Sequence, residues 1–156
     1  METNDRMDLD PAIAALLADF PVIITWPVQW GDMDAYRHVN NTVFFRWFET
    51  ARIAYTTRLG LKTMMIRDQV GPILAAIACD YRRQIVYPDT VVIGSRVSRI
   101  GRTSFGMDHA LVSAAQTAIA AEARSTIVVF DYAANTPVPV PDEIRRAIAD
   151  IEGRPL

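Results

Sequence analysis

The stretch that decides the fold of this chain runs from Asn40 to Gly60 and reads NNTVFFRWFETARIAYTTRLG. Either asparagine at its start can cap a helix, and Gly60 fits the left-handed residue that ends one. A helix that is apolar around most of its circumference is usually buried. We therefore predict a long central helix from about residue 41 to residue 59. The main apolar stripe of this helix consists of Phe44, Phe48, Ala51 and Tyr55. The stripe is widened by Val43, Trp47 and Ala54.

The rest of the chain favours β structure. One strand is predicted at 22–30, where Pro27 indicates an edge or a bulge, and four long strands follow at 73–86, 90–100, 103–113 and 118–130. Sequential strands joined by short turns make an antiparallel sheet. Alanine propensity alone would also allow a helix at 110–123. The sequence predicts an α+β domain in which a five-stranded antiparallel sheet wraps around the central helix, with short helices at 9–18 and 142–151.

Length and composition define the class of protein. The 156 residues suit a single domain, 1–156, with a core at about 22–131. With 51% apolar residues and a net charge of −2, the chain resembles neither a disordered protein nor a nucleic-acid binder. Cys79 is the one cysteine, so neither an intramolecular disulfide nor a cysteine-rich zinc site is expected.

No membrane segment is expected. The longest run without a charged residue is the thirteen residues between Asp108 and Glu122, whereas a spanning helix needs about 20 apolar residues. The N-terminal residues METNDRMDLDP lack the basic and apolar parts of a secretory signal. We expect a cytoplasmic protein.

The most unusual segment precedes the central helix and has the pattern Asp32-x-Asp34-x-x-x-His38-x-Asn40-Asn41. A helix start offers backbone N–H groups without intrahelical acceptors and a partial positive charge. Such donors suit an oxygen on which negative charge develops, and a nearby carboxylate could attack a carbonyl or activate a water. Acyl transfer to water is therefore reasonable here. The alternative is a polar loop whose side chains only satisfy turns and caps.

These residues also carry a family resemblance. Residues 30–41 (WGDMDAYRHVNN) and 44–52 (FFRWFETAR) resemble the 4-hydroxybenzoyl-CoA thioesterase-like branch of the hotdog-fold superfamily. Residues 80–83 (DYRR), 87–90 (YPDT) and 99–105 (RIGRTSF) are similar to it in the same order. The resemblance implies a hotdog fold and hydrolysis of acyl-CoA thioesters, with CoA as part of the substrate and no metal or other cofactor. It implies that Asp34 is the catalytic carboxylate and that the backbone N–H of Asn41 polarises the thioester.

Departures from the family pattern bear on which acyl group fits. Tyr36 and Arg37 stand where the family often has a small residue and glycine before the histidine, and Phe44 stands where a tyrosine is usual.

His38 is interpreted as a brace for the loop or as a base. Glu49 is the second candidate for the catalytic carboxylate, because another hotdog branch uses a helix carboxylate. It could instead pair with a neighbouring arginine at helical spacing.

A polar cluster around the turn near residue 101 is either solvated or holds the CoA phosphates. Its members are Arg99, Arg102, Thr103 and Ser104. His109 is interpreted as a satisfied core histidine and Cys79 as a small buried hydrophobe.

The sequence also predicts an oligomer and leaves two alternatives to thioester hydrolysis. Unpaired sheet edges predict a homodimer or a dimer of dimers, and the resemblance implies an active site at the dimer interface. One alternative is a hotdog hydratase or dehydratase, which usually pairs an aspartate with a histidine on a different loop pattern. The other is a non-catalytic acyl-CoA binder. Sensors of that kind tend to carry a DNA-binding domain, for which the 21 residues before the first predicted strand are too few.

Overall fold

The computed structural model describes residues 9–155, and the acidic segment 1–8 lies outside the described residues. In these residues, no helix is long and apolar enough to cross a membrane. The elements, in chain order, are α1 (Pro11–Leu16), β1 (Val22–Pro27), η2 (Trp30–Asp32), α2 (Asn41–Arg58), α3 (Leu61–Asp68), β2 (Val70–Tyr81), β3 (Thr90–Ile100), β4 (Ser104–Ser113), β5 (Ala118–Asp131), β6 (Thr136–Pro137) and α4 (Asp142–Glu152).

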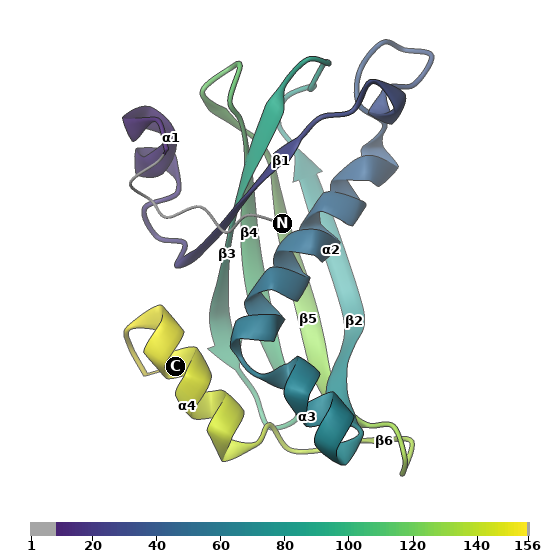
Figure 1. The fold of residues 1–156 in the computed structure, drawn as a ribbon, viewed down its shortest axis with the longest axis vertical. Coiled ribbons are helices and arrows are strands. Elements are labelled where there is room, and N and C mark those ends of the chain that lie inside the picture. The colour runs from purple at the N-terminus through teal and green to yellow at the C-terminus, as the bar shows by residue number, and fades with distance from the viewer. Residues whose placement is uncertain (1–8, 156) are drawn as a thin grey trace.

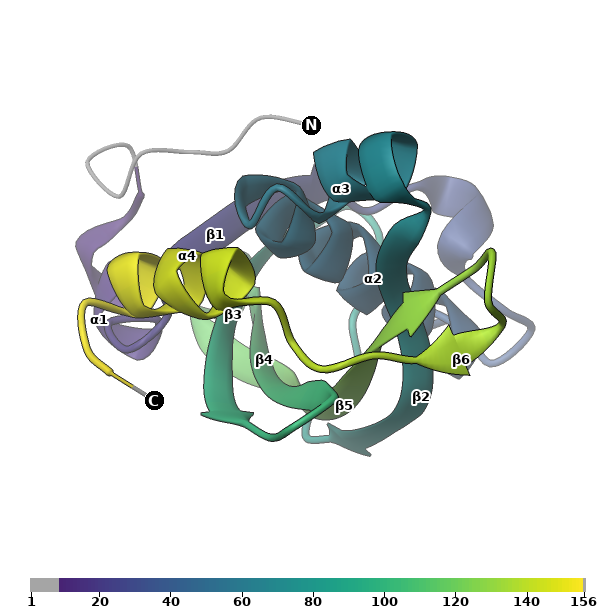
Figure 2. The ribbon, with the colours of Figure 1, turned by 90° about the horizontal axis from the view of Figure 1, so that it is seen from below.

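The strands form one antiparallel sheet in the order β1-β3-β4-β5-β2, and the short β6 pairs with β5. The sheet curls around α2, which crosses its concave face (Figures 1 and 2). The predicted α+β class and the antiparallel sheet that wraps around the central helix are confirmed, and β6 is a further short strand that the sequence did not predict.

The central helix forms where it was predicted. The Asn40 side chain caps it by accepting a hydrogen bond from the backbone N–H of Thr42, and Gly60 follows it with φ 81°. A left-handed φ costs a glycine little because it has no Cβ. The apolar residues that predicted a buried helix are all buried: Val43, Phe44, Trp47, Phe48, Ala51, Ala54 and Tyr55.

The segment between α2 and β3 differs from the prediction in two ways. Helix α3, which buries Leu61 and Met64, was not predicted. The strand predicted at 73–86 is β2, which begins at Val70, ends at Tyr81 and pairs with β5 instead of with its sequence neighbour β3. The chain leaves the sheet after Tyr81 because the buried Ile85 packs in the core, while its carbonyl accepts a hydrogen bond from Val39 of another loop.

The alanine-rich run is strand on both sides of a short turn, so helix propensity did not decide it. Ala110, Ala121 and Ala123 are buried between neighbouring strands and their covering layers. Tertiary packing overrides propensity in such cases. β1 ends at Pro27, three residues earlier than predicted, and is an edge strand as the proline indicated.

The terminal helices α1 and α4 cover parts of the sheet that α2 does not cover. α1 packs a second apolar cluster, which includes Ile13 and Leu17, on the convex face of the sheet. Gly94 of β3 permits this approach, since a Cβ there would lie 2.6 Å from the Cβ of Phe20. On the other side, α4 contributes Ile144 and Ile148 to the main core. The second edge strand, β2, exposes Leu74 and the alanines that follow it.

Candidate active site

The polar loop before α2 is tied down by backbone hydrogen bonds. The N–H of Asp34 donates to the carbonyl of His38, and the N–H of Arg37 donates to the carbonyl of Asp34, both at 3.0 Å. The N–H of Asn40 donates to the carbonyl of Asp32 at 2.9 Å. These bonds fold residues 32–40 back on themselves at the start of α2, which lies at the upper right in Figure 1.

The Asp34 carboxylate is held from two sides. One oxygen accepts from the backbone N–H of Tyr36 at 2.8 Å, and the other accepts from Nδ2 of Asn40 at 3.2 Å. Asn40 is also the residue that caps α2, with its Oδ1 accepting from the N–H of Thr42 at 3.0 Å. One side chain therefore fixes the carboxylate relative to the helix start.

The first residue of α2 is Asn41, so its N–H has no intrahelical acceptor. The helix dipole adds partial positive charge at the same point. A carbonyl oxygen placed there would be stabilised as it gains negative charge. Acyl transfer to water needs a carboxylate and a donor for the carbonyl oxygen. The Asp34 carboxylate and the N–H of Asn41 supply these two groups at the start of α2.

A cavity of about 510 Å³ opens over these groups, and Asp34, His38 and Asn41 all line it. Its far wall is the end of β2 and the loop after it, including Tyr81 and Arg83. The volume falls within the range of small-molecule sites. The structure therefore brings together three of the predicted site residues.

Tyr81 is a lining residue that the site prediction did not include. Its hydroxyl donates to the carbonyl of Asn41 at 3.1 Å, and its ring meets Phe44 edge-on with centroids 5.2 Å apart. Burial raises the pKa of Tyr81. The only signal in the sequence was that Tyr81 and Arg83 belong to a segment that carries the family resemblance.

His38 and Arg37 show how the loop keeps its shape. Nδ1 of His38 lies 3.3 Å from the carbonyl oxygen of Val39, and its ring stacks on Tyr36 at a centroid distance of 6.4 Å. These contacts fit the brace interpretation of His38. Arg37 has φ 64°, at a position where the family often has glycine, so the loop keeps the left-handed turn at a cost of about 1–2 kcal/mol.

Asp32 makes its side-chain contact within its own turn. Its carboxylate accepts from the backbone N–H of Gln29 at 2.8 Å and caps η2. Glu49, the second catalytic candidate, lies about two turns along α2 from Asn41. It lines a different cavity together with Arg52 and Leu74, so within one chain it does not join the Asp34 site.

The predicted phosphate-binding cluster lies at the turn between β3 and β4. This turn is at the lower end of the molecule in Figure 1, where α3 and α4 also lie, while α2 begins at the upper end. The carbonyl of Arg102 accepts from the N–H of Val140, which ties the turn to the segment before α4. A single chain therefore does not bring Asp34 together with Arg99, Arg102, Thr103 and Ser104.

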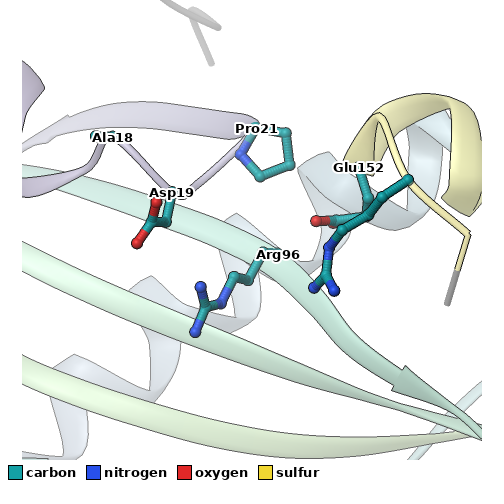
Figure 3. A pocket seen from close by; sticks show the side chains of 6 residues that line it. Ala18, Asp19, Pro21, Arg96 and Glu152 are labelled. Carbon is teal, nitrogen blue, oxygen red and sulfur yellow. The ribbon is translucent and has the colours of Figure 1, made fainter.

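A further cavity, of about 550 Å³, lies between the connector from α1 to β1, strand β3 and the end of α4 (Figure 3). Arg96 and Glu152 both line this cavity and make contacts to other elements. Arg96 pairs through Nη2 with Asp108 at 3.3 Å and lies over the ring of Phe20, while its buried Nε has no hydrogen-bond partner among the described residues. Glu152 accepts from the hydroxyl of Tyr55 and from the N–H of Val97. None of the predicted site residues lines this cavity.

The described residues do not gather three histidine, cysteine, aspartate or glutamate side chains in a possible metal site. His109 is an internal residue, with Nδ1 2.8 Å from the hydroxyl of Ser95 and Nε2 3.2 Å from that of Ser125. Burial lowers the pKa of His109 to about 3, so its ring is neutral at pH 7. The interpretation of His109 as a satisfied core histidine is confirmed.

Known structures with appreciable sequence identity share this architecture. A thioesterase from Thermus thermophilus, crystallised with coenzyme A and zinc, is 33% identical with a TM-score of 0.78, over 88% of this chain and 98% of that one. The PA2801 protein from Pseudomonas aeruginosa, named "a putative Thioesterase", is 36% identical with a TM-score of 0.73, over 81% of this chain and 97% of that one.

Sequence comparisons point the same way. The uncharacterised protein YsmA of Bacillus subtilis (strain 168) is 29% identical over 82 residues, which are 53% of this chain and 54% of that protein. The match thus spans about half the length of that relative. The profile of the thioesterase-like superfamily matches residues 28–148, which include the whole Asp34 loop, α2 and the sheet from β2 to β6. The chain has the hotdog fold and belongs to the thioesterase-like superfamily.

Proposed function

We propose that the protein hydrolyses acyl-CoA thioesters to a free carboxylic acid and CoA. The observation that carries the proposal is the Asp34 carboxylate, which Asn40 holds beside the first N–H of α2 at the wall of a 510 Å³ cavity. The thioester carbonyl would accept a hydrogen bond from the N–H of Asn41. Charge developing on that oxygen would then be stabilised throughout the reaction.

Asp34 can act in either of two ways. As a nucleophile, its carboxylate adds to the thioester carbon and expels the CoA thiolate, and water then cleaves the mixed anhydride to release the acid and restore Asp34. As a general base, it takes a proton from a water molecule that attacks the same carbon, and it passes that proton to the CoA sulfur as the thiolate leaves, which restores the Asp34 carboxylate. Both routes need no group beyond this chain, the substrate and water.

The proposal includes a homodimer or a dimer of dimers. In one chain the Arg99–Ser104 cluster lies at the opposite end from Asp34, so it can bind the CoA phosphates of that site only across a subunit interface. The long edge strand β2 is exposed and suited to pairing with a second copy. This arrangement would complete the substrate site from two chains.

The deciding experiment is thiol release from a panel of acyl-CoAs by Asp34→Asn. We expect the fold to be kept and kcat to fall by about 10²-fold or more. Asp32→Asn is the matched control and should retain turnover, because its carboxylate only caps η2. If Asp34→Asn stays near wild type while Glu49→Gln is inactive, the assignment moves to Glu49. Binding of acyl-CoA without any thiol release would identify a binder or a hydratase instead.

A further inference from the structure

The first turn of α2 is held from two sides by different parts of the chain. On the loop side, the Asn40 side chain donates to the Asp34 carboxylate and accepts from the N–H of Thr42. On the sheet side, the Tyr81 hydroxyl donates to the carbonyl of Asn41 at 3.1 Å. Among the described residues, this is the one side-chain hydrogen bond that joins the first turn of α2 to the sheet.

Tyr81 stands at a rigid point of the sheet. It is the last residue of β2 and pairs with Ala121 of β5. The next two backbone N–H groups, those of Arg82 and Arg83, donate to the carbonyl of Ala120 at 2.8 and 3.0 Å. The end of β2 therefore cannot move without breaking backbone hydrogen bonds to β5.

The helix start needs such a support because it is exposed. Asn41 and Thr42 are exposed to solvent, whereas Val43 and Phe44 after them are buried. Helix ends fray most easily, since solvent competes for their backbone groups. The ring of Tyr81 also meets that of Phe44 edge-on at 5.2 Å, so one side chain contacts the first turn at two points. Burial raises the pKa of Tyr81, so its hydroxyl keeps its proton at neutral pH and remains a donor.

We propose that Tyr81 is a positioning residue, which fixes the N–H of Asn41 relative to the opposite wall of the Asp34 cavity. This role rests on the proposed thioester hydrolysis. Asn40 ties the helix start to the loop, but the loop and the helix start could still shift together relative to the end of β2. The Tyr81 hydroxyl joins these two walls of the cavity. Because the N–H of Asn41 would stabilise the oxygen of the transition state, a shift of the helix start would lower kcat.

Tyr81→Phe tests this role, because it removes the hydroxyl and keeps the ring against Phe44. In the thiol-release assay, kcat should fall about threefold to tenfold, as expected for one lost hydrogen bond, while KM changes by less than about twofold. Tyr132→Phe is the matched control. The Tyr132 hydroxyl donates to the carbonyl of Pro72 at 3.0 Å, and its ring meets Phe130 edge-on at 5.5 Å. Tyr132 is 42% exposed and Tyr81 is 45% exposed. Both variants should therefore lose similar stability, while Tyr132→Phe keeps the wild-type kcat.

Amide hydrogen exchange supplies a readout that needs no turnover. The N–H groups of Thr42 and Val43 both bond to Asn40 in the first turn. In Tyr81→Phe they should exchange at least about threefold faster than in wild type, because the first turn opens more often. In Tyr132→Phe their exchange should be unchanged.

A Tyr81→Phe protein with the wild-type kcat would overturn the proposal. So would an equal loss of kcat in Tyr132→Phe, since the effect would then be one of general stability. A rise in KM at constant kcat would also contradict it, because Tyr81 would then bind the substrate directly. If wild type releases no thiol from any acyl-CoA, the proposed function fails, and the exchange rates alone decide whether Tyr81 holds the helix start.

Discussion

The Glu152 carboxylate at the end of α4 joins three distant parts of the chain. It accepts from the hydroxyl of Tyr55 in α2 at 2.5 Å and from the backbone N–H of Val97 in β3 at 2.7 Å. Tyr55 and Val97 are completely buried. Burial and the neighbouring carboxylate raise the pKa of Tyr55 well above its usual value, so the hydroxyl stays protonated and remains a donor.

Glu152→Ala removes the acceptor from two buried donors. Each hydrogen bond to a charged group contributes about 1.5–3 kcal/mol. The cavity beside Glu152 lets water approach part of the vacated space, so we expect a loss of about 2–3 kcal/mol in the free energy of unfolding. For a domain of this size, that is a fall of about 5–10 °C in Tm. Chemical denaturation at pH 7 and calorimetry measure the two quantities.

A double-mutant cycle with Tyr55→Phe isolates the side-chain contact. Because Tyr55→Phe removes one of the two donors, the cycle should give a coupling energy of about 1–2 kcal/mol. Asp150→Ala, at an exposed position of the same helix, should change stability by less than about 0.5 kcal/mol. A coupling energy near zero, or a Glu152→Ala protein as stable as Asp150→Ala, would refute the reasoning.

Three further predictions concern pH, substrate binding and assembly. His109 has a folded-state pKa of about 3, below its unfolded value of about 6.5. The unfolded state therefore binds the extra proton first as pH falls, and stability should decline by about 2 kcal/mol between pH 7 and pH 5. His109→Gln should reduce that decline, and an unchanged pH profile would contradict it. Arg102→Ala should raise KM for acyl-CoA more than it lowers kcat, and should not affect a short thioester without the nucleotide; equal effects on both substrates would exclude a phosphate contact. On dilution, light scattering and thiol release should show dissociation and loss of activity together, whereas a fully active monomer would exclude the shared site.

Much of the fold could be predicted because it follows from neighbouring residues. Helix α2 is specified by its apolar spacing, by Asn40 at its start and by Gly60 at its end, all within 21 residues. Caps and periodicity act over one or two turns, so they can be read without the rest of the chain. The same holds for the hydrogen bonds made within the Asp34 loop, which join residues at most eight positions apart. The bond from Val39 to Ile85 is the exception, because it ties the loop to a distant segment.

Other features were decided only by the tertiary structure. No local pattern shows that β2 passes its neighbour β3 and pairs with β5, because register and partner depend on burying one face of each strand. That same pairing brings Tyr81 against Asn41, forty residues away, and so completes the wall of the Asp34 cavity. Local sequence thus determined the central helix and the loop before it, while the residues that face them were set by packing between distant segments.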